Sequence, residues 1–327
     1  MQSTLLLKKL ARCLISVGLA ATAAQAPAQG YPNRPIRLIV PFPAGGPSDT
    51  TARSIAEDLS QLLKQPVIVE NKPGAGAIIG SEYVLAQPAD GHTLLMASNV
   101  ISTGKWLYPS MTFEPVRDFR AVVGVFRSPH QVAVAPDFPG KGIQDLIDMA
   151  RRENGKMNYA SGGTGTMPHL GAERFKQVTG IEMQHIPYRG SAPANVALMA
   201  GDVPVHFDIE FSVRPLLKSG RLRSLGVTAL KRSPQFPDVP TLDEQGIKGF
   251  ELYSTFGIVA RKETPDQIVQ QLNQALNQVM DSPQFKERLA TVGAEKIGGP
   301  PDAFQKMIMD DYRVWGEVIQ KANLKID

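Results

Sequence analysis

The sequence predicts an α/β fold of about two domains. Short runs rich in β-branched residues, such as Ile36–Val40, alternate with longer segments whose apolar residues recur at helical spacing, such as Asp49–Leu63. This alternation is typical of helices that cover mostly parallel sheets through right-handed crossovers. The length of 327 residues suits roughly two domains of ordinary size. With 43% hydrophobic and 20% charged residues, the composition is that of a folded protein and not of a disordered or fibrous chain.

The first 28 residues have the pattern of a secretory signal peptide. Three basic residues precede a short apolar run, Leu14–Ala24, and Ala26–Ala28 form a small-x-small cleavage site. We expect cleavage after Ala28 and export to the periplasm. The alternative is an uncleaved N-terminal anchor, although the apolar run is shorter than the about 20 residues of a membrane span.

Charge and cysteine content exclude several classes of function. Three of the 35 basic residues and the single cysteine, Cys13, lie in the predicted signal peptide. The mature chain would therefore be nearly neutral, with 32 basic and 31 acidic residues, which argues against a nucleic-acid partner. A mature protein without cysteine has no thiol for catalysis or for metal binding.

The mature chain divides into short strands and longer helices, with no repeat or low-complexity linker. We expect strands at 36–40, 67–69, 93–97, 121–126, 131–135, 157–160, 183–188, 203–208, 222–228 and 255–260. We expect helices at 49–63, 78–86, 142–153, 168–178, 192–200, 212–218, 266–279, 283–290 and 302–322. Without a flexible linker, the chain is expected to cross between the two domains more than once. Ligands of such folds bind beyond the carboxyl ends of the strands.

The first candidate loop lies between the strand 36–40 and the helix that follows it. Gly45 and Gly46 allow the backbone to turn freely, and Ser48 is a suitable N-cap for the helix. The amino end of a helix attracts a carboxylate or a phosphate. The alternative is an ordinary capped helix start in which Asp49 itself interacts with the helix dipole.

The second candidate loop, Ser161–Thr166, has three glycines and three hydroxyls, again between a strand and a helix. Pro168 fits the first turn of that helix, where a missing N–H group costs nothing. His169 begins the same helix and is the one histidine that we place near the ligand. Two such loops on different domains would clamp an acidic ligand.

Two further segments follow predicted strands in the same way. Tyr188–Pro193 leads into a helix, and Asp208 ends a strand. The Asp208 carboxylate could accept a hydrogen bond from a ligand, or it could cap the next element. The sequence leaves both interpretations open.

Enzymatic alternatives fit the sequence poorly. Ser161 lies on a strand-to-helix turn, but the segment Tyr159–Gly163 lacks the first glycine of the Gly-x-Ser-x-Gly elbow, and no histidine follows the candidate acid Asp208. The glycines of Gly74–Gly80 have the wrong spacing for a dinucleotide-binding turn and instead predict a turn into a closely packed helix. The five histidines show no metal-binding spacing. We therefore expect no enzyme, no cofactor and no metal.

Six motifs occur in order along the chain: Tyr31–Arg37, Val40–Gly46, Val69–Gly76, Asn158–Gly162, Ile186–Pro193 and Phe236–Thr241. With them the chain resembles a known family, the exported Bug-type receptors of tripartite tricarboxylate transporters. The resemblance implies a two-lobed periplasmic binding protein of type II-like architecture. Each lobe would have a central sheet, and the lobes would close on a ligand in the cleft between them. It also implies small carboxylate ligands (dicarboxylates, tricarboxylates, acidic amino acids or aromatic acids) and delivery to membrane permease subunits.

We expect residues 29–127 and 229–327 to form lobe 1, residues 128–228 to form lobe 2, and the receptor to be a monomer. From the loops and the resemblance together, the expected ligand-binding residues are Phe42, Ala44, Gly45, Gly46, Ser48, Asp49, Asn99, Ser161, Gly162, Thr164, Gly165, Thr166, His169, Gly190, Ser191, Ala192, Pro193 and Asp208. Glu210 and Arg214 stand where the family pattern favours apolar residues. Whether Arg189, Arg214 and Asn99 face the cleft decides the ligand. The alternatives are a receptor that feeds a sensor kinase and a secreted serine hydrolase that uses Ser161.

Overall fold

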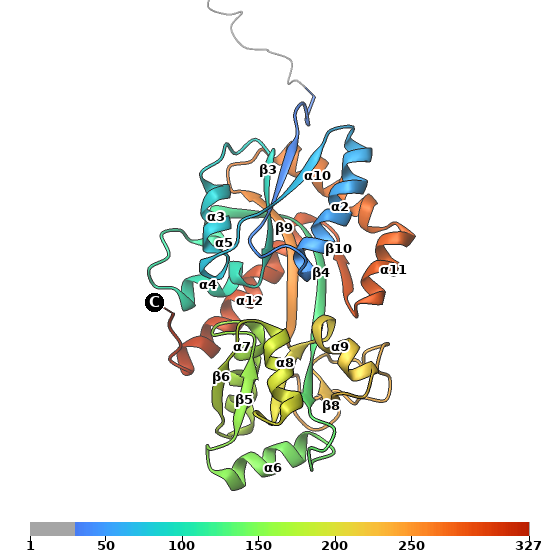
Figure 1. The fold of residues 1–327 in the computed structure, drawn as a ribbon. Helices are drawn as coiled ribbons and strands as arrows, with labels where there is room; N and C mark the ends of the chain where they lie inside the picture. Colours follow the sequence, from blue (N-terminus) through green and yellow to red (C-terminus); the bar gives the residue numbers. More distant parts are fainter. Residues whose placement is uncertain (1–29, 327) are drawn as a thin grey trace, which may run out of the picture. The chain divides into compact units, whose positions relative to one another are not determined.

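The computed structural model describes residues 30–326, so the predicted signal peptide lies outside the described residues. The chain divides after Arg34, and the unit that begins at Pro35 carries the helices and strands shown in Figure 1. Its strands are β1 (Ile36–Val40), β2 (Val67–Asn71), β3 (Thr93–Ser98), β4 (Phe119–Val134), β5 (Asn158–Ser161), β6 (Gln184–Pro187), β7 (Val205–Ile209), β8 (Arg223–Val227), β9 (Tyr253–Arg261) and β10 (Glu295–Gly298).

The helices alternate with the strands, as the sequence predicts for an α/β fold. They are α2 (Pro47–Leu63), the 3₁₀ helix η1 (Ala75–Ala77), α3 (Ile78–Leu85), α4 (Val100–Leu107), α5 (Pro115–Asp118), α6 (Ile143–Glu153), α7 (Met167–Thr179), α8 (Ser191–Ala200), α9 (Glu210–Lys218), α10 (Asp266–Met280), α11 (Pro283–Thr291) and α12 (Pro301–Lys321). Among the described residues, none of these helices combines the length and the apolar character of a membrane span.

The sheet is built from two parallel groups of three strands, joined by long antiparallel strands. β2, β1 and β3 pair in parallel, and so do β6, β5 and β7. β9 pairs antiparallel with both β3 and β4, and β4 pairs antiparallel with β7, β8 and β10. The expectation of mostly parallel sheets was therefore wrong for the middle of the sheet, because β4 and β9 run across from one group to the other.

The strand β4 belongs to both halves of the sheet. Its first part pairs with β9 as far as Pro129, and from His130 onward it pairs with β7. The sequence divided this strand into two, at 121–126 and 131–135. This change of partner in β4 lies close to the predicted boundary between the two lobes at residues 127 and 128. The lobe boundaries themselves stay a prediction.

Each half of the unit has its own buried apolar cluster. One cluster packs around β3, β9 and α12, with Phe119 and Phe304 among its members. The other packs around β5, β7 and α7, with Tyr159 and Phe175 fully buried. Helix α12 contacts α4, β4 and α7 and so connects the two halves (Figure 1).

Three elements had no counterpart in the sequence-based prediction: α4, α5 and β10. Helix α4 contains Ser102, Thr103 and Gly104, which have low intrinsic helix propensity. It forms because these residues are buried against α12, so tertiary packing outweighs local preference. The predicted turn into a closely packed helix at Gly74–Gly80 is confirmed, since Gly74 and Gly76 have positive φ and a Cβ atom on Gly80 of α3 would lie 2.7 Å from Cβ of Pro41.

Candidate functional site

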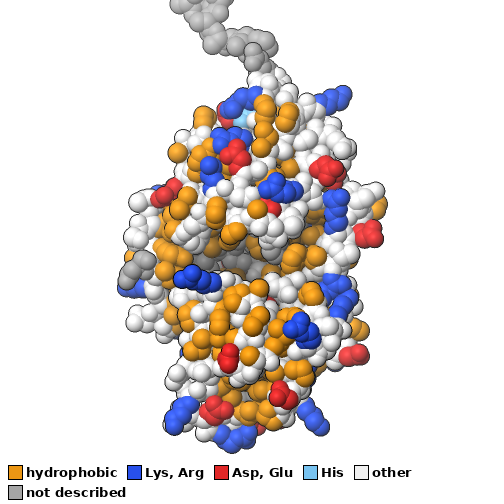
Figure 2. All heavy atoms as spheres, in the orientation of Figure 1, with side chains coloured by type: hydrophobic (Ala, Val, Ile, Leu, Met, Phe, Trp, Pro, Cys, Tyr) orange, Lys and Arg blue, Asp and Glu red, His pale blue; other side chains and the backbone are white. Residues whose placement is uncertain are grey.

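Six helices begin where parallel strands end. In the upper half of Figure 1, α2, η1–α3 and α4 follow β1, β2 and β3, and in the lower half α7, α8 and α9 follow β5, β6 and β7. The two groups of helix amino ends face one another, and Figure 2 shows that the surface is hollowed between the two halves. No side chain caps the amino end of α2, α7 or α8. Their N–H groups and dipoles are therefore available to an anion.

The first loop, Pro41–Gly46, is held in shape by a buried carboxylate. Asp49 is 2% exposed and accepts hydrogen bonds from the Gly45 N–H group (2.8 Å) and from the Asn71 amide (2.9 Å). Arg53 forms an ion pair with the same carboxylate at 3.0 Å. Burial raises the pKa of Asp49, but the hydrogen bonds from Arg53, Gly45 and Asn71 outweigh burial and lower it below its ordinary value. The carboxylate is thus occupied by protein groups, which gives it a structural role in the loop.

The start of α2 differs from the expected one. The helix begins at Pro47 with Gly46 as its N-cap, so the predicted N-cap at Ser48 is wrong. Proline fits the first helical position because its missing N–H group would have no partner there, so the helix starts two residues earlier. Ser48 is buried inside the first turn.

The second loop, Ser161–Thr166, is fixed by its own hydroxyl groups. The Ser161 Oγ accepts a hydrogen bond from the Gly163 N–H group (3.1 Å) and lies 3.0 Å from the Gly163 carbonyl and 2.6 Å from Nε2 of His185. A hydroxyl offers one donor and two acceptor positions, so these three contacts use all of them. The Thr166 hydroxyl donates to the same carbonyl at 2.7 Å. Thr164 is exposed, Thr166 is half-buried and Ser161 is buried, so Thr164 is the most accessible of the three to solvent.

Ser161 and His185 lie close enough to form a Ser–His pair of the kind that serine hydrolases use. No local sequence pattern links the two residues, because His185 lies on the neighbouring strand β6 and precedes Asp208 along the chain. Ser161 is fully buried, so a substrate carbonyl cannot reach its Oγ atom. Among the described residues no carboxylate is hydrogen-bonded to His185, so the pair has no third member.

The third segment joins the second loop directly. The Gly190 N–H group donates to the Gly162 carbonyl at 3.1 Å, and α8 begins at Ser191. The Ser191 hydroxyl donates to Asp208 at 2.6 Å, and the Asn195 amide donates to the other carboxylate oxygen at 2.7 Å. Asp208 is fully buried. Side-chain donors of α8 therefore occupy the Asp208 carboxylate, which favours a structural role for it, and the backbone N–H groups of α8 stay available to a ligand.

Asn99 is engaged by the protein on both sides of its amide. Its Oδ1 accepts a hydrogen bond from the Thr255 N–H group at 2.7 Å, and its Nδ2 donates to Asp311 at 3.2 Å. The residue is 6% exposed. It therefore connects β9 and α12 to the start of α4, and burial limits the access of a ligand to its amide.

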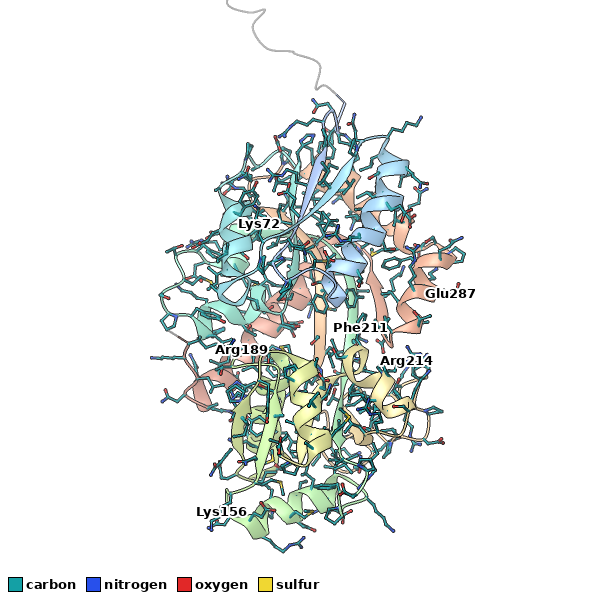
Figure 3. All side chains as sticks on the ribbon, viewed as in Figure 1. Lys72, Lys156, Arg189, Phe211, Arg214 and Glu287 are labelled. Atoms are coloured by element: carbon teal, nitrogen blue, oxygen red, sulfur yellow. The ribbon has the colours of Figure 1, made fainter. Side chains whose placement is uncertain are left out.

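Two arginines lie at the lower rim of the hollow. In Figure 3, Arg189 lies beside the amino end of α8 and Arg214 beside α9. Among residues 30–326, neither guanidinium forms a salt bridge, and the Nε atom of Arg214 is buried without a hydrogen bond. Next to Arg214, burial raises the pKa of Glu210, and the charge of Arg214 and hydrogen bonds from Ser233 (2.7 Å) and Gln131 (2.6 Å) oppose this shift. Both unpaired arginines add positive charge to this side of the hollow.

The described site residues fall into two groups, with Asn99 apart from both. The first loop brings together Phe42 to Asp49, and the second loop meets the Gly190–Pro193 segment and Asp208. Exposed members are Ala44, Gly45, Thr164, Ala192 and Pro193; half-buried members are Phe42, Gly46, Gly162, Gly165, Thr166, Gly190 and Ser191; buried members are Ser48, Asp49, Asn99, Ser161, His169 and Asp208. The exposed and half-buried members are those that a ligand can reach.

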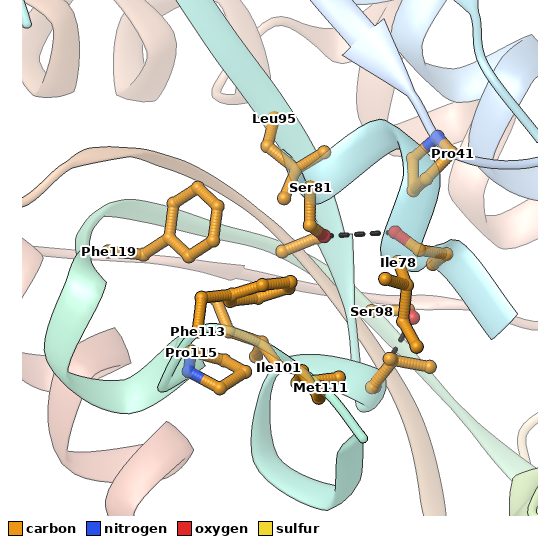
Figure 4. A pocket seen from close by; sticks show the side chains of 13 residues that line it. Pro41, Ile78, Ser81, Leu95, Ser98, Ile101, Met111, Phe113, Pro115 and Phe119 are labelled. Atoms are coloured by element: carbon orange, nitrogen blue, oxygen red, sulfur yellow. Dashed lines mark hydrogen bonds between the residues drawn. The ribbon is translucent and has the colours of Figure 1, made fainter. Parts of the chain in front are cut away.

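A small apolar cavity lies behind the first loop and is drawn in Figure 4. Its lining includes Pro41, Ile78 and Phe113, and its volume is about 10 Å³. That volume is near the least that holds one water molecule. The cavity is thus a packing gap beneath the loop and not a ligand site.

A larger cavity of about 240 Å³ lies where α7, α12 and β9 meet. Its lining carries both signs of charge, with Arg127 and Arg174 against Glu251 and Asp311. Arg174 donates to the Glu251 carbonyl at 2.7 Å and lies over the rings of Phe250 and Trp315. Through these contacts Arg174 connects α7 to α12. Because the lining carries both signs of charge, the cavity does not favour an anionic ligand over a cationic one.

Comparison with known proteins distinguishes between a solute-binding receptor and a serine hydrolase. Residues 51–324 match the family described as "Tripartite tricarboxylate transporter family receptor". The chain belongs to this family. Tripartite tricarboxylate transporter receptors bind solutes and are not enzymes, so the serine hydrolase interpretation is excluded.

Three solved structures show the same fold. Rpa4515 of R. palustris, solved with adipate, is 34% identical, with 90% of this chain and 100% of that chain covered and a TM-score of 0.81. The periplasmic binding protein BugD is 35% identical, with 90% and 100% covered and a TM-score of 0.78. MatC (Rpa3494) of Rhodopseudomonas palustris, solved with bound malate, is 28% identical, with 88% and 100% covered and a TM-score of 0.77. The predicted two-lobed binding-protein fold is confirmed.

Sequence reasoning missed three residues that shape the two loops: Arg53, Asn71 and His185. Arg53 could have been found from its i,i+4 spacing to Asp49 on a predicted helix. Asn71 and His185 come from neighbouring strands, and no local pattern links them to the loops they hold.

Proposed function

We propose that this receptor captures a small carboxylate in the hollow between its two halves and delivers it to the permease subunits of a tripartite tricarboxylate-type transporter. Residues 29–127 with 229–327, and residues 128–228, would be the two lobes that close on the ligand. The mature protein would act in the periplasm as a monomer. Closure would be a hinge motion whose population the ligand shifts.

The observation that carries the proposal is the set of uncapped helix amino ends that follow β1, β5 and β6. A carboxylate placed there would accept hydrogen bonds from N–H groups that lack a side-chain cap. The buried carboxylates Asp49 and Asp208 are satisfied by protein donors, so they would repel the ligand less than free carboxylates would.

The unpaired Arg189 and Arg214 favour a ligand with a second acidic group. An arginine can bind a carboxylate with two parallel hydrogen bonds, and both arginines lie on the α8–α9 side of the hollow. Adipate in Rpa4515 and malate in MatC are dicarboxylates bound by proteins of this fold. Dicarboxylates are therefore the first ligands to test.

Thermal unfolding of the mature chain, refolded to remove bound solutes, tests the proposal. The panel holds adipate, malate, citrate, acidic amino acids and aromatic acids, with neutral amides and sugars as controls. A ligand at 100 times its Kd should stabilise the fold by about 2.7 kcal/mol. Stabilisation by one or more acids and by no control is the expected result. A response to neutral controls alone would overturn the carboxylate proposal.

A further inference from the structure

A cluster of three rings lies behind the second loop, with Tyr159 and His169 buried and His185 half-buried. The rings of His169 and His185 are parallel within 9°, with centroids 3.7 Å apart. The Tyr159 ring lies beside this pair, with centroid distances of 5.1 Å to His185 and 6.3 Å to His169. β5, β6 and α7 contribute one ring each, so the cluster joins three elements that carry the second loop and its neighbour.

Strand register and helix spacing put these rings together. Tyr159 and His185 are register partners in the parallel pair β5–β6, so their side chains stand side by side on one face. The Tyr159 hydroxyl donates to Glu173 at 2.6 Å, and Lys176 pairs with the same carboxylate at 3.0 Å. The Tyr159 ring is thus fixed to α7, which also carries His169.

Each histidine makes one hydrogen bond to the second loop. The Gly165 N–H group donates to Nδ1 of His169 at 3.0 Å, so that nitrogen carries no proton. Nε2 of His185 lies 2.6 Å from Ser161 Oγ at the other end of the loop. With its proton on Nε2, His185 donates to Ser161, and the Ser161 hydroxyl is then free to donate to the Gly163 carbonyl.

Gly165 needs this support because its backbone has a left-handed φ of 76° and packs closely. A Cβ atom there would lie 2.7 Å from Ile326 and 2.9 Å from Leu107. The loop therefore turns tightly at Gly165, and the His169 contact fixes the direction of its N–H group.

We propose that His169 and His185 are positioning residues that hold the two ends of the second loop in the shape that receives the ligand carboxylate. This inference rests on the proposed function, since it assigns to the loop the binding of that carboxylate. Neither ring would touch the ligand. Their role would be to keep Ser161 and Gly165 in place before the ligand arrives, which lowers the ordering cost of binding.

The electrostatic surroundings agree with two neutral rings. Burial lowers the pKa of His169 to about 3 and that of His185 to about 4. The charged groups beside the pair are Glu173 and Lys176 of α7, which form an ion pair with one another. With neutral rings, the affinity for a fully ionised dicarboxylate should not change between about pH 6 and pH 8.

Two matched pairs of variants test the proposal in the full mature chain. His169→Asn keeps an acceptor near the position of Nδ1, whereas His169→Leu keeps bulk without the acceptor. His185→Gln keeps an amide near Nε2, whereas His185→Phe keeps the stacked ring alone. The readouts are amide hydrogen exchange of residues 161–166 without ligand, calorimetric titration with adipate, and urea unfolding of each variant.

We expect the Leu and Phe variants to exchange loop amides about tenfold faster and to bind adipate about tenfold more weakly, as the loss of one good hydrogen bond predicts. The Asn and Gln variants should recover most of both losses. Equal behaviour within each pair, or loop exchange that stays at the parent rate, would overturn the positioning role.

A double-mutant cycle keeps the proposal testable if a single variant folds poorly. Ser161→Ala removes the same contact as His185→Phe from the other side, so the two losses should not add. Additive losses would contradict the proposal. Failure of the parent chain to bind any acid of the panel would count against the proposed function alone, because loop exchange is measured without ligand.

Discussion

The Ser191 hydroxyl donates a hydrogen bond of 2.6 Å to the fully buried carboxylate of Asp208. Asp208 also accepts from the Asn195 amide at 2.7 Å and from the Ile209 N–H group at 2.9 Å. One carboxylate therefore connects the first turn of α8 to the start of α9. Substitutions at Asp208 and in the nearby loops can therefore distinguish effects on stability from effects on ligand binding.

Asp208→Asn should destabilise the fold by about 1–3 kcal/mol. An amide nitrogen in place of one carboxylate oxygen would face another donor and leave a buried group unpaired. Urea unfolding at pH 7 measures the loss. Asp202→Asn is the control, because Asp202 is exposed in the same half and its loss should stay within about 0.5 kcal/mol. Equal stability of the two variants would contradict the structural role of Asp208.

Gly46→Val should abolish ligand binding and leave the fold intact. Gly46 has a φ of −77°, which other residues adopt, and a Cβ atom would meet nothing closer than a carbonyl oxygen at 3.7 Å. The added side chain would occupy the amino end of α2, where the carboxylate is expected. Titration with a carboxylate that stabilises the parent gives the result, and an unchanged Kd would move the site away from the first loop.

Thr166→Ala should weaken ligand binding by about 1 kcal/mol, since its hydroxyl bonds the Gly163 carbonyl inside the second loop at 2.7 Å. Thr179→Ala is the matched control, because the Thr179 hydroxyl makes a similar backbone bond at the far end of α7. Both variants should lose comparable stability. If both also lose affinity equally, the effect comes from α7 as a whole and not from the loop.

Asn99→Ala should lower stability by about 1–3 kcal/mol and raise the pKa of Asp311. Burial raises that pKa to about 6, and the hydrogen bond from Asn99 opposes the shift. The variant also leaves the Thr255 N–H group without its partner. Carboxyl NMR and urea unfolding measure the two effects. Lost affinity for a carboxylate with unchanged stability would instead place Asn99 in the ligand site.

Stability should fall as the pH falls from about 6.5 toward 4. Burial lowers the pKa of both His130 and His169 to about 3, so the unfolded chain takes up protons at these residues before the folded chain does. Each contributes stability that is complete above its unfolded pKa and declines by about 1.4 kcal/mol per pH unit below it. Asp311 acts in the opposite direction, because its raised pKa lets the folded state take up a proton first.

His169→Asn removes the contribution of one of these histidines to the pH dependence of stability. The slope of unfolding free energy against pH between 4 and 6 should become shallower by about 1.4 kcal/mol per pH unit. Urea unfolding at several pH values measures the slope. An unchanged slope would mean that His169 is protonated in the folded protein, which would also contradict its contact with the Gly165 N–H group.

Much of the architecture follows from local sequence patterns. The strand–loop–helix units at Ile36–Leu63 and Asn158–Thr179 are specified by apolar periodicity, glycines and proline, all within a few tens of residues. The six family motifs identified the receptor family for the same reason, since each is a short contiguous run. The predicted N-cap at Ser48 is a local error, because Pro47 has the stronger preference for the first helical position and Gly46 becomes the cap.

Tertiary structure alone decided which side chains are free to meet a ligand. Asn99 looked available in the sequence but is bonded to Thr255 and Asp311, more than 150 residues away along the chain. Ser161 looked like a ligand donor, but His185 and Gly163 use its hydroxyl. Such pairings depend on strand register and on the crossing of β4 and β9 between the two halves. The periodicity of apolar residues indicates which face of a helix or strand is buried. It does not indicate which distant residues that face contacts.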